Sequence, residues 1–110
     1  MVNLIDQRVL RPDPSFFSYA LSKAGLYLAT KTLAQALAPT VRVNGIGPGP
    51  TLPSIHQAPG EFEAEAQAAL LARPVTPQAL AQALRYLIDA EFVTGQMIAV
   101  DSGQHLSFGT

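Results

Sequence analysis

The chain has 110 residues, of which 48% are hydrophobic and 14% charged, with a formal net charge of -1 and no cysteine. This length suits a single domain. The scattered basic residues argue against a nucleic-acid interface, and the lack of cysteine excludes disulfides and thiolate metal sites. No membrane span or signal peptide is predicted. With no cysteine in the chain, a cytoplasmic location is the default expectation.

The low share of charged residues bears on assembly. Typical domains carry about 25% Asp, Glu, Lys and Arg, so this chain has little polar surface to spread over a free-standing globule. We therefore expect part of its apolar surface to meet another protein surface, as in a homo-oligomer.

Apolar strand patterns and helix patterns alternate along the chain. The predicted elements are a strand over 2–5 ending near Asp6, a helix over 15–37, a strand over 41–46, helices over 61–72 and 77–89, and a strand over 96–100. Strands separated by helices favour a parallel α/β sheet with right-handed crossovers. The loop over 47–60 is rich in proline and glycine, and a loop of this length is typical of a binding segment.

Tyr19 and Lys23 lie four residues apart on the predicted long helix, so their side chains emerge from the same face. An ammonium group beside a phenol favours the phenolate, which lowers the pKa of a tyrosine from about 10 toward neutrality. Such a tyrosine suits general acid catalysis on a carbonyl or an imine. An ordinary surface pair on a helix would show the same spacing, so these two residues alone leave both interpretations open.

Four segments strengthen the catalytic interpretation, namely SYALSKAGL (18–26), VRVNGIGPG (41–49), VTGQ (93–96) and VDSG (100–103). In order and spacing they resemble the C-terminal half of the short-chain dehydrogenase/reductase family, across nearly all of the chain. The resemblance implies a doubly wound, Rossmann-type sheet, of which this chain would hold about three strands. It also implies that Tyr19 donates a proton as hydride arrives, while Lys23 holds the nicotinamide ribose and lowers the tyrosine pKa.

Asp6 departs from the usual pattern of the family, which places a serine thirteen residues before the tyrosine. Pteridine reductases and the related dihydromonapterin and dihydrofolate reductases carry aspartate there, so the resemblance is closest to that subgroup. A carboxylate can accept hydrogen bonds from the amino and N–H groups of a pterin, or help relay a proton to a ring nitrogen. From the residues alone, Asp6 is equally a strand-end residue that caps a turn.

Pro48, Gly49 and Thr51 follow the second predicted strand, at the carboxyl edge where open α/β sheets bind ligands. The resemblance implies that they contact the nicotinamide and phosphates of the cofactor, NADPH. From the residues alone the segment is a proline-glycine turn, and it leads into a loop rather than the helix that a phosphate fingerprint must open. His56 and His105 lack ligand spacing, so no metal site is predicted.

The glycine-rich phosphate loop and the first four strands of the family would precede Val2. We therefore expect residues 1–110 to form one partial domain that holds a catalytic half-site without the cofactor cradle, so its activity in isolation stays open. The favoured function is that of a reductase fragment. The complete form would pass hydride from NADPH to a C=N bond of a small-molecule pterin through Asp6, Tyr19 and Lys23, with Thr51 helping to seat the cofactor.

Two alternatives remain. The substrate could be a ketone or a 3-oxoacyl group, with Asp6 as an incidental replacement of the usual serine. The chain could also be a non-catalytic α/β module that associates with itself through the apolar side chains of its long helix region, which are Phe16, Phe17, Leu21 and Leu28.

Overall fold

Three parallel strands form one sheet, as predicted. The structure is a computed structural model, and it describes residues 1–52 and 57–108. The strands β1 (Val2–Leu4), β2 (Asn44–Pro48) and β3 (Met97–Val100) pair in the order β1-β2-β3. The helices are α1 (Phe17–Leu37), α2 (Glu61–Ala68) and α3 (Pro77–Asp89), and the short 3-10 turns are η1 (Gln7–Val9), η2 (Pro14–Phe16) and η3 (Gln104–Leu106).

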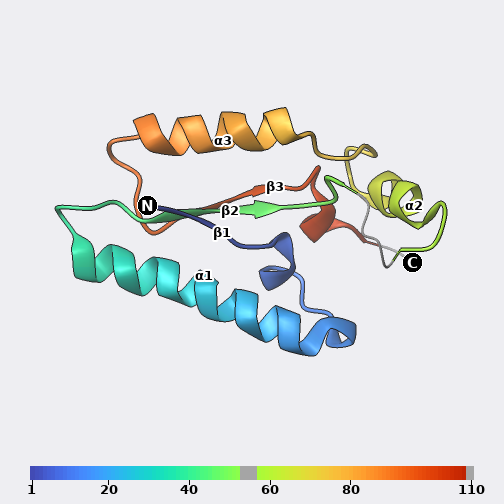
Figure 1. The fold of residues 1–110 in the computed structure, drawn as a ribbon, viewed down its shortest axis with the longest axis horizontal. Helices are drawn as coiled ribbons and strands as arrows, with labels where there is room; N and C mark the ends of the chain where they lie inside the picture. Colours follow the sequence, from blue (N-terminus) through green and yellow to red (C-terminus); the bar gives the residue numbers. More distant parts are fainter. Residues whose placement is uncertain (53–56, 109–110) are drawn as a thin grey trace.

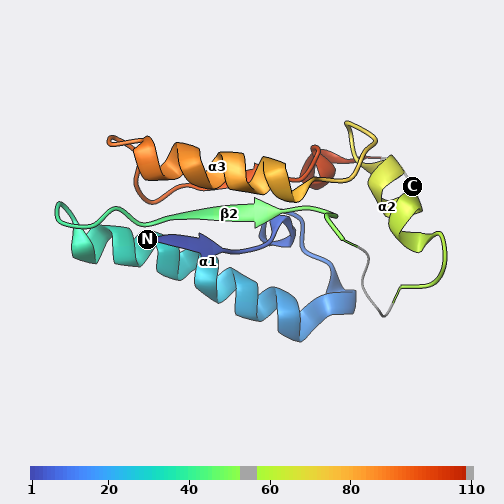
Figure 2. The same cartoon turned by 45° about the horizontal axis from the view of Figure 1, so that its top comes forward.

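The helices α1 and α3 cover opposite faces of the sheet (Figure 1). The shorter helix α2 lies beyond the carboxyl ends of the strands, near the C-terminal segment (Figure 2). The core between these layers is apolar, with Ile5, Val43, Ile46 and Leu87 all buried. Only the central strand β2 is largely buried, while β1 and β3 stay partly exposed. In open α/β sheets, ligands bind at the carboxyl ends of the strands.

Two polar side chains bind the connection between α3 and β3. One lies just before β2, and the other is the first residue of β2. Arg42 donates from its guanidinium to the carbonyl oxygens of Leu87 and Ile88, both at 2.8 Å, and so satisfies the last turn of α3. Asn44 is buried, and its amide donates to the carbonyl oxygen of Val93 at 2.9 Å. These bonds hold the connection, and with it β3, in register beside β2.

The second strand begins at Asn44 and not at Val41, which corrects the predicted boundary. The reason lies in competing partners, because the backbone N–H of Val43 donates to the side-chain oxygen of Thr94 and not to a strand. The strand also continues to Pro48, where Gly47 and Pro48 pair with Ala99 and Val100 of β3. Alternating apolar side chains indicate which residues are buried. Val43 is buried but does not pair with a neighbouring strand, so burial alone misplaced the start of β2.

Two helix boundaries also differ from the prediction. Helix α2 ends at Ala68 and not at residue 72, because the chain turns to let the backbone N–H of Leu71 donate to the carbonyl oxygen of Ser102. Helix α1 begins at Phe17, since residues 14–16 form a 3-10 turn that Asp13 caps by accepting from the backbone N–H of Ser15. A good helix composition therefore extends past the point where tertiary contacts end the helix.

The surface of α1 carries apolar side chains that this chain leaves exposed. Phe17, Leu21 and Leu28 are exposed by 72%, 65% and 63%, and Phe16 by 42%. This surface is the one for which self-association is predicted, and self-association stays a prediction. Within the described parts of the chain, no helix is both long enough and apolar enough to cross a membrane.

Candidate active site

The carboxyl ends of the strands lead to one cleft of about 900 Å³. β1 leads through Ile5 to Asp6, β2 leads to Gly49, and the turn after β3 supplies Gln104. Helix α2 forms the remaining wall, and the lining residues are Asp6, Gln7, Arg8, Phe16, Tyr19, Pro48, Gly49, Pro50, Thr51, Leu52, Gln57, Glu61, Phe62, Ala64, Glu65 and Gln104. The cleft therefore lies where open α/β sheets bind their ligands.

Asp6 caps a turn, as one of its two interpretations expects, and it also contacts the predicted catalytic tyrosine. Its Oδ1 accepts a hydrogen bond from the backbone N–H of Arg8 at 2.8 Å, which caps the turn η1. Its Oδ2 accepts a second hydrogen bond, from the hydroxyl of Tyr19, at 2.5 Å. The cap fixes the carboxylate, so the same local structure that ends β1 presents an anionic oxygen to the tyrosine.

The pKa of Tyr19 shifts in the direction opposite to the one expected. Burial, the hydrogen bond to Asp6 and the negative charge of Asp6 raise the pKa of Tyr19 to about 12. Lys23 does not offset this shift, because its Nζ donates to the carbonyl oxygen of Leu4 at 3.1 Å and lies 6.0 Å from the centre of the tyrosine ring. The expected lowering of the Tyr19 pKa by Lys23 is therefore wrong for this structure, since burial and the neighbouring carboxylate both raise that pKa.

This geometry predicts a measurable titration. In the folded protein, the Tyr19 phenol should ionise near pH 12, and Asp6→Asn should bring its pKa back toward the usual value of about 10, because the negative charge is gone. Since the folded pKa is the higher one, the bond adds stability below about pH 10, and this stability is lost as the pH rises from about 10 to about 12. Solvent screening keeps the effect small, since Tyr19 is 44% exposed.

The measurement is the ultraviolet absorbance of tyrosinate as a function of pH. The difference between the protein and its Tyr19→Phe variant isolates this phenol from the other two tyrosines, Tyr27 and Tyr86. An ionisation of Tyr19 below pH 10 would contradict the arrangement described here.

The segment after β2 is shaped by its contact with the turn after β3. A Cβ on Gly49 would lie 2.6 Å from both Cα and Cβ of Asp101, so no larger residue fits there without moving backbone. The backbone N–H of Gly49 donates to the carbonyl oxygen of Val100, and the hydroxyl of Thr51 donates to the carbonyl oxygen of Gly49 at 3.0 Å. The close packing against Asp101 thus requires a glycine at position 49, independently of any cofactor.

The structure brings most of the predicted site residues to the same cleft. Asp6 and Tyr19 line it from one side, and Pro48, Gly49 and Thr51 from the end of β2. Lys23 lies one helical turn further along α1 and is not among the lining residues. Of the two histidines, His56 lies outside the described residues, and His105 pairs through Nδ1 with the buried carboxylate of Asp101 at 2.6 Å.

Several lining residues were not singled out from the sequence. Glu65 on α2 accepts hydrogen bonds from the side-chain amides of Gln57 and Gln104, at 2.8 and 3.2 Å, which joins α2 to η3. Arg8 comes from the turn η1, and Phe16, which was named from the sequence only for self-association, comes from η2. No spacing rule connects residues so far apart in the chain, although Arg8 could have been noticed as a cation two residues after Asp6.

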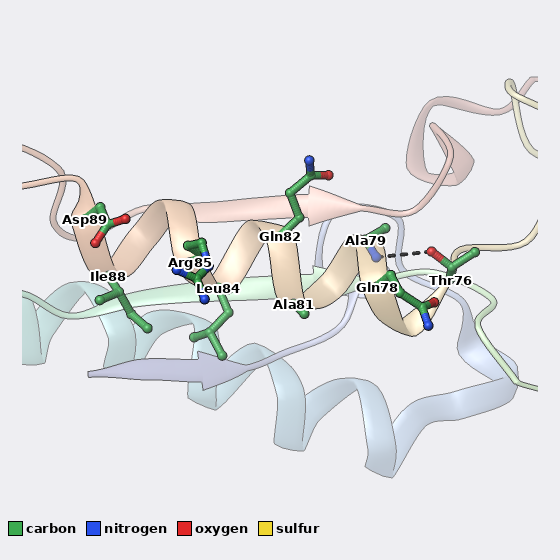
Figure 3. A pocket seen from close by; sticks show the side chains of 9 residues that line it. All are labelled: Thr76, Gln78, Ala79, Ala81, Gln82, Leu84, Arg85, Ile88 and Asp89. Atoms are coloured by element: carbon green, nitrogen blue, oxygen red, sulfur yellow. Dashed lines mark hydrogen bonds between the residues drawn. The ribbon is translucent and has the colours of Figure 1, made fainter.

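A second hollow, of about 740 Å³, follows the outer side of α3 (Figure 3). All of its lining residues come from α3 and the capping residue Thr76, whose hydroxyl accepts from the backbone N–H of Ala79 at 3.1 Å. None of the predicted site residues lies there. This hollow is therefore the surface of a single helix and not a second site of the kind described above.

The comparison with known proteins decides the family. Residues 2–105 match the family model described as enoyl-(acyl carrier protein) reductase. The short-chain dehydrogenase/reductase homologue YusR of Bacillus subtilis (strain 168) is 38% identical over 93 residues, which are 84% of this chain and 72% of that protein. The chain belongs to the short-chain dehydrogenase/reductase family.

Within this family, two relatives lie in the subgroup that the sequence resembles. Dihydromonapterin reductase of Escherichia coli O6:K15:H31 (strain 536 / UPEC) is 30% identical over 106 residues, covering 96% of this chain and 44% of that protein. FolM alternative dihydrofolate reductase 1 from Brucella suis, a crystal structure in complex with NADP, has a TM-score of 0.95 and 52% identity over 99% of this chain and 44% of that one.

These two likenesses confirm the resemblance to the pteridine and dihydromonapterin reductases, and the second confirms the Rossmann-type fold. The chain spans less than half the length of either relative, since it covers 44% of each.

Proposed function

We propose that the protein transfers hydride from NADPH to a C=N bond of a dihydropterin. The observation that carries this proposal is the bonded pair of Asp6 and Tyr19 in the cleft at the strand ends. Dihydromonapterin reductase among the relatives and a relative crystallised with NADP support the substrate class and the cofactor.

The aspartate explains why a pterin would be preferred over a ketone. A carboxylate only accepts hydrogen bonds, and a pterin ring presents amino and N–H groups that donate them, whereas a ketone oxygen is itself an acceptor. A pterin that donates to Asp6 would share the negative charge that now acts on Tyr19. The pKa of the phenol would then fall from about 12, and its proton would become easier to transfer.

The proton and hydride steps balance in this arrangement. NADPH, when bound, supplies the hydride that forms the new C–H bond. Tyr19 donates its phenolic proton to the substrate nitrogen, which forms the new N–H bond, and the phenolate recovers a proton from solvent. Lys23 uses one of its three N–H donors on Leu4, so two remain for the ribose hydroxyls of the cofactor.

The test is the oxidation of NADPH by the full-length protein in the presence of 7,8-dihydrobiopterin, with NADH and a 3-oxoacyl thioester as comparisons. We expect turnover with the dihydropterin and little with the thioester. Preference for the thioester would replace the pterin proposal by the 3-oxoacyl alternative. Absence of both turnover and NADPH binding would favour the non-catalytic module.

A further inference from the structure

Arg8 occupies a defined position on the wall of the cleft. Its guanidinium carbon lies 3.8 Å from the centre of the Phe16 ring, so the cation rests on the face of the aromatic ring. Both residues line the same cleft as Asp6 and Tyr19. The backbone N–H of Arg8 also donates to Asp6, which ties the position of Arg8 to that of the carboxylate.

The stacked guanidinium keeps its hydrogen-bonding capacity. An arginine presents its N–H donors at the edge of a planar group, and stacking on an aromatic ring covers only the face. Among residues 1–52 and 57–108, the only contact within 4.0 Å between a basic and an acidic side chain joins His105 to Asp101. Arg8 is therefore a pre-oriented cation whose charge no carboxylate of the described chain neutralises at contact distance.

The opposite wall of the cleft carries the opposite charge. Glu61 and Glu65 project from α2, where Glu61 accepts from the backbone N–H of Ala58 at 2.6 Å and Glu65 from two side-chain amides. These carboxylates repel an anion from α2, while Arg8 attracts it to the wall that carries Asp6. Arg8 is the only basic side chain among the described residues that line the cleft.

We propose that Arg8, held on Phe16, binds an anionic group on the side chain of the substrate whose ring donates to Asp6. The subsite would take a carboxylate or a phosphate, since the edge of a guanidinium matches the oxygens of either group. The inference rests on the proposed function and deepens it, because it selects pterins with an anionic side chain over neutral ones. Arg8 acts here as a specificity-determining residue and not in the hydride or proton step.

The test compares three 7,8-dihydropterin substrates in the full-length protein and its Arg8→Met variant. Dihydrofolate carries carboxylates, dihydroneopterin monophosphate carries a phosphate, and dihydrobiopterin carries neither. Methionine keeps an apolar stem against Phe16 and removes the charge. We expect Arg8→Met to raise KM for at least one anionic substrate about tenfold more than KM for dihydrobiopterin, with kcat little changed.

The three substrates distinguish the possible outcomes. A selective effect on dihydrofolate assigns the subsite to a carboxylate, and one on the monophosphate assigns it to a phosphate. An equal change for all three substrates, or no change, overturns the subsite, while turnover of none of them overturns the proposed function itself. The matched control is Arg85→Met on the outer side of α3, far in the chain from the cleft residues, which should leave all three KM values unchanged.

Discussion

Tyr19→Phe should lower kcat for NADPH-dependent dihydropterin reduction by about 10²- to 10⁴-fold in the full-length protein, the range typical for loss of a general acid. The substitution removes the only group in the Asp6–Tyr19 pair that can donate a proton, and it leaves the ring in place. The fold should persist, because Tyr19 is 44% exposed and water can replace its hydroxyl beside Asp6. The measurement is the steady-state rate of NADPH oxidation at saturating substrate.

The matched control for this variant is Tyr27→Phe on the same helix. Tyr27 lies under the ammonium of Lys31 at 4.7 Å from its ring centre and does not line the cleft. Its loss should leave kcat unchanged, and both variants should unfold at nearly the temperature of the unmodified protein. Full activity of Tyr19→Phe would show that Tyr19 is not the proton donor.

Asp6→Ser should lower kcat/KM for a dihydropterin by about 10²-fold, as expected when a charged hydrogen bond and its effect on a general acid are both lost. Serine is the residue that the family usually places here. It can cap η1 as aspartate does, so the loss does not arise from a broken turn. The activity toward a simple ketone should fall less, or rise, because a hydroxyl can donate to a carbonyl oxygen and a carboxylate cannot.

Two further variants check this interpretation. Asp13→Ser changes the equivalent cap of η2, where Asp13 accepts from the backbone N–H of Ser15, and should leave the substrate preference unchanged. Asp6→Ala removes both the cap and the carboxylate, so it should add a loss of stability of about 1 kcal/mol to the same loss of pterin activity. Equal losses toward pterin and ketone in Asp6→Ser would show that Asp6 supports the site without selecting the substrate.

Local sequence patterns predicted the presence of the helices and strands better than the residues at which they begin and end. The helix over 77–89 was placed correctly because Thr76 and Pro77 form a cap and a first helical turn that act locally. The strand predicted over 41–46 is displaced, because Val43 is fully buried but bonds to a side chain and not to a neighbouring strand. Helix composition continues past Ala68, yet a hydrogen bond to the distant Ser102 turns the chain there.

The site was predicted only in part for a related reason. The resemblance indicated Asp6, Tyr19 and the segment after β2, and the structure brings these residues to one cleft. It also implied that Lys23 would lower the pKa of Tyr19, whereas burial and the carboxylate that accepts a hydrogen bond from the phenol at 2.5 Å raise it. The spacing of two residues on a helix gives their common face but not the length of the contact between them.

The sequence by itself determined the order of strands and helices, the parallel α/β class and the family, because periodicity, caps and motif spacing are properties of neighbouring residues. Only the tertiary structure decided how the strand ends meet, which carboxylate faces Tyr19, and that Arg8 on Phe16 lies opposite the carboxylates of α2. The sign of a pKa shift and the charge of a cleft depend on distances between residues far apart in the chain. Those distances are set by the packing of α1 against the sheet and by the place of α2 beyond the strand ends.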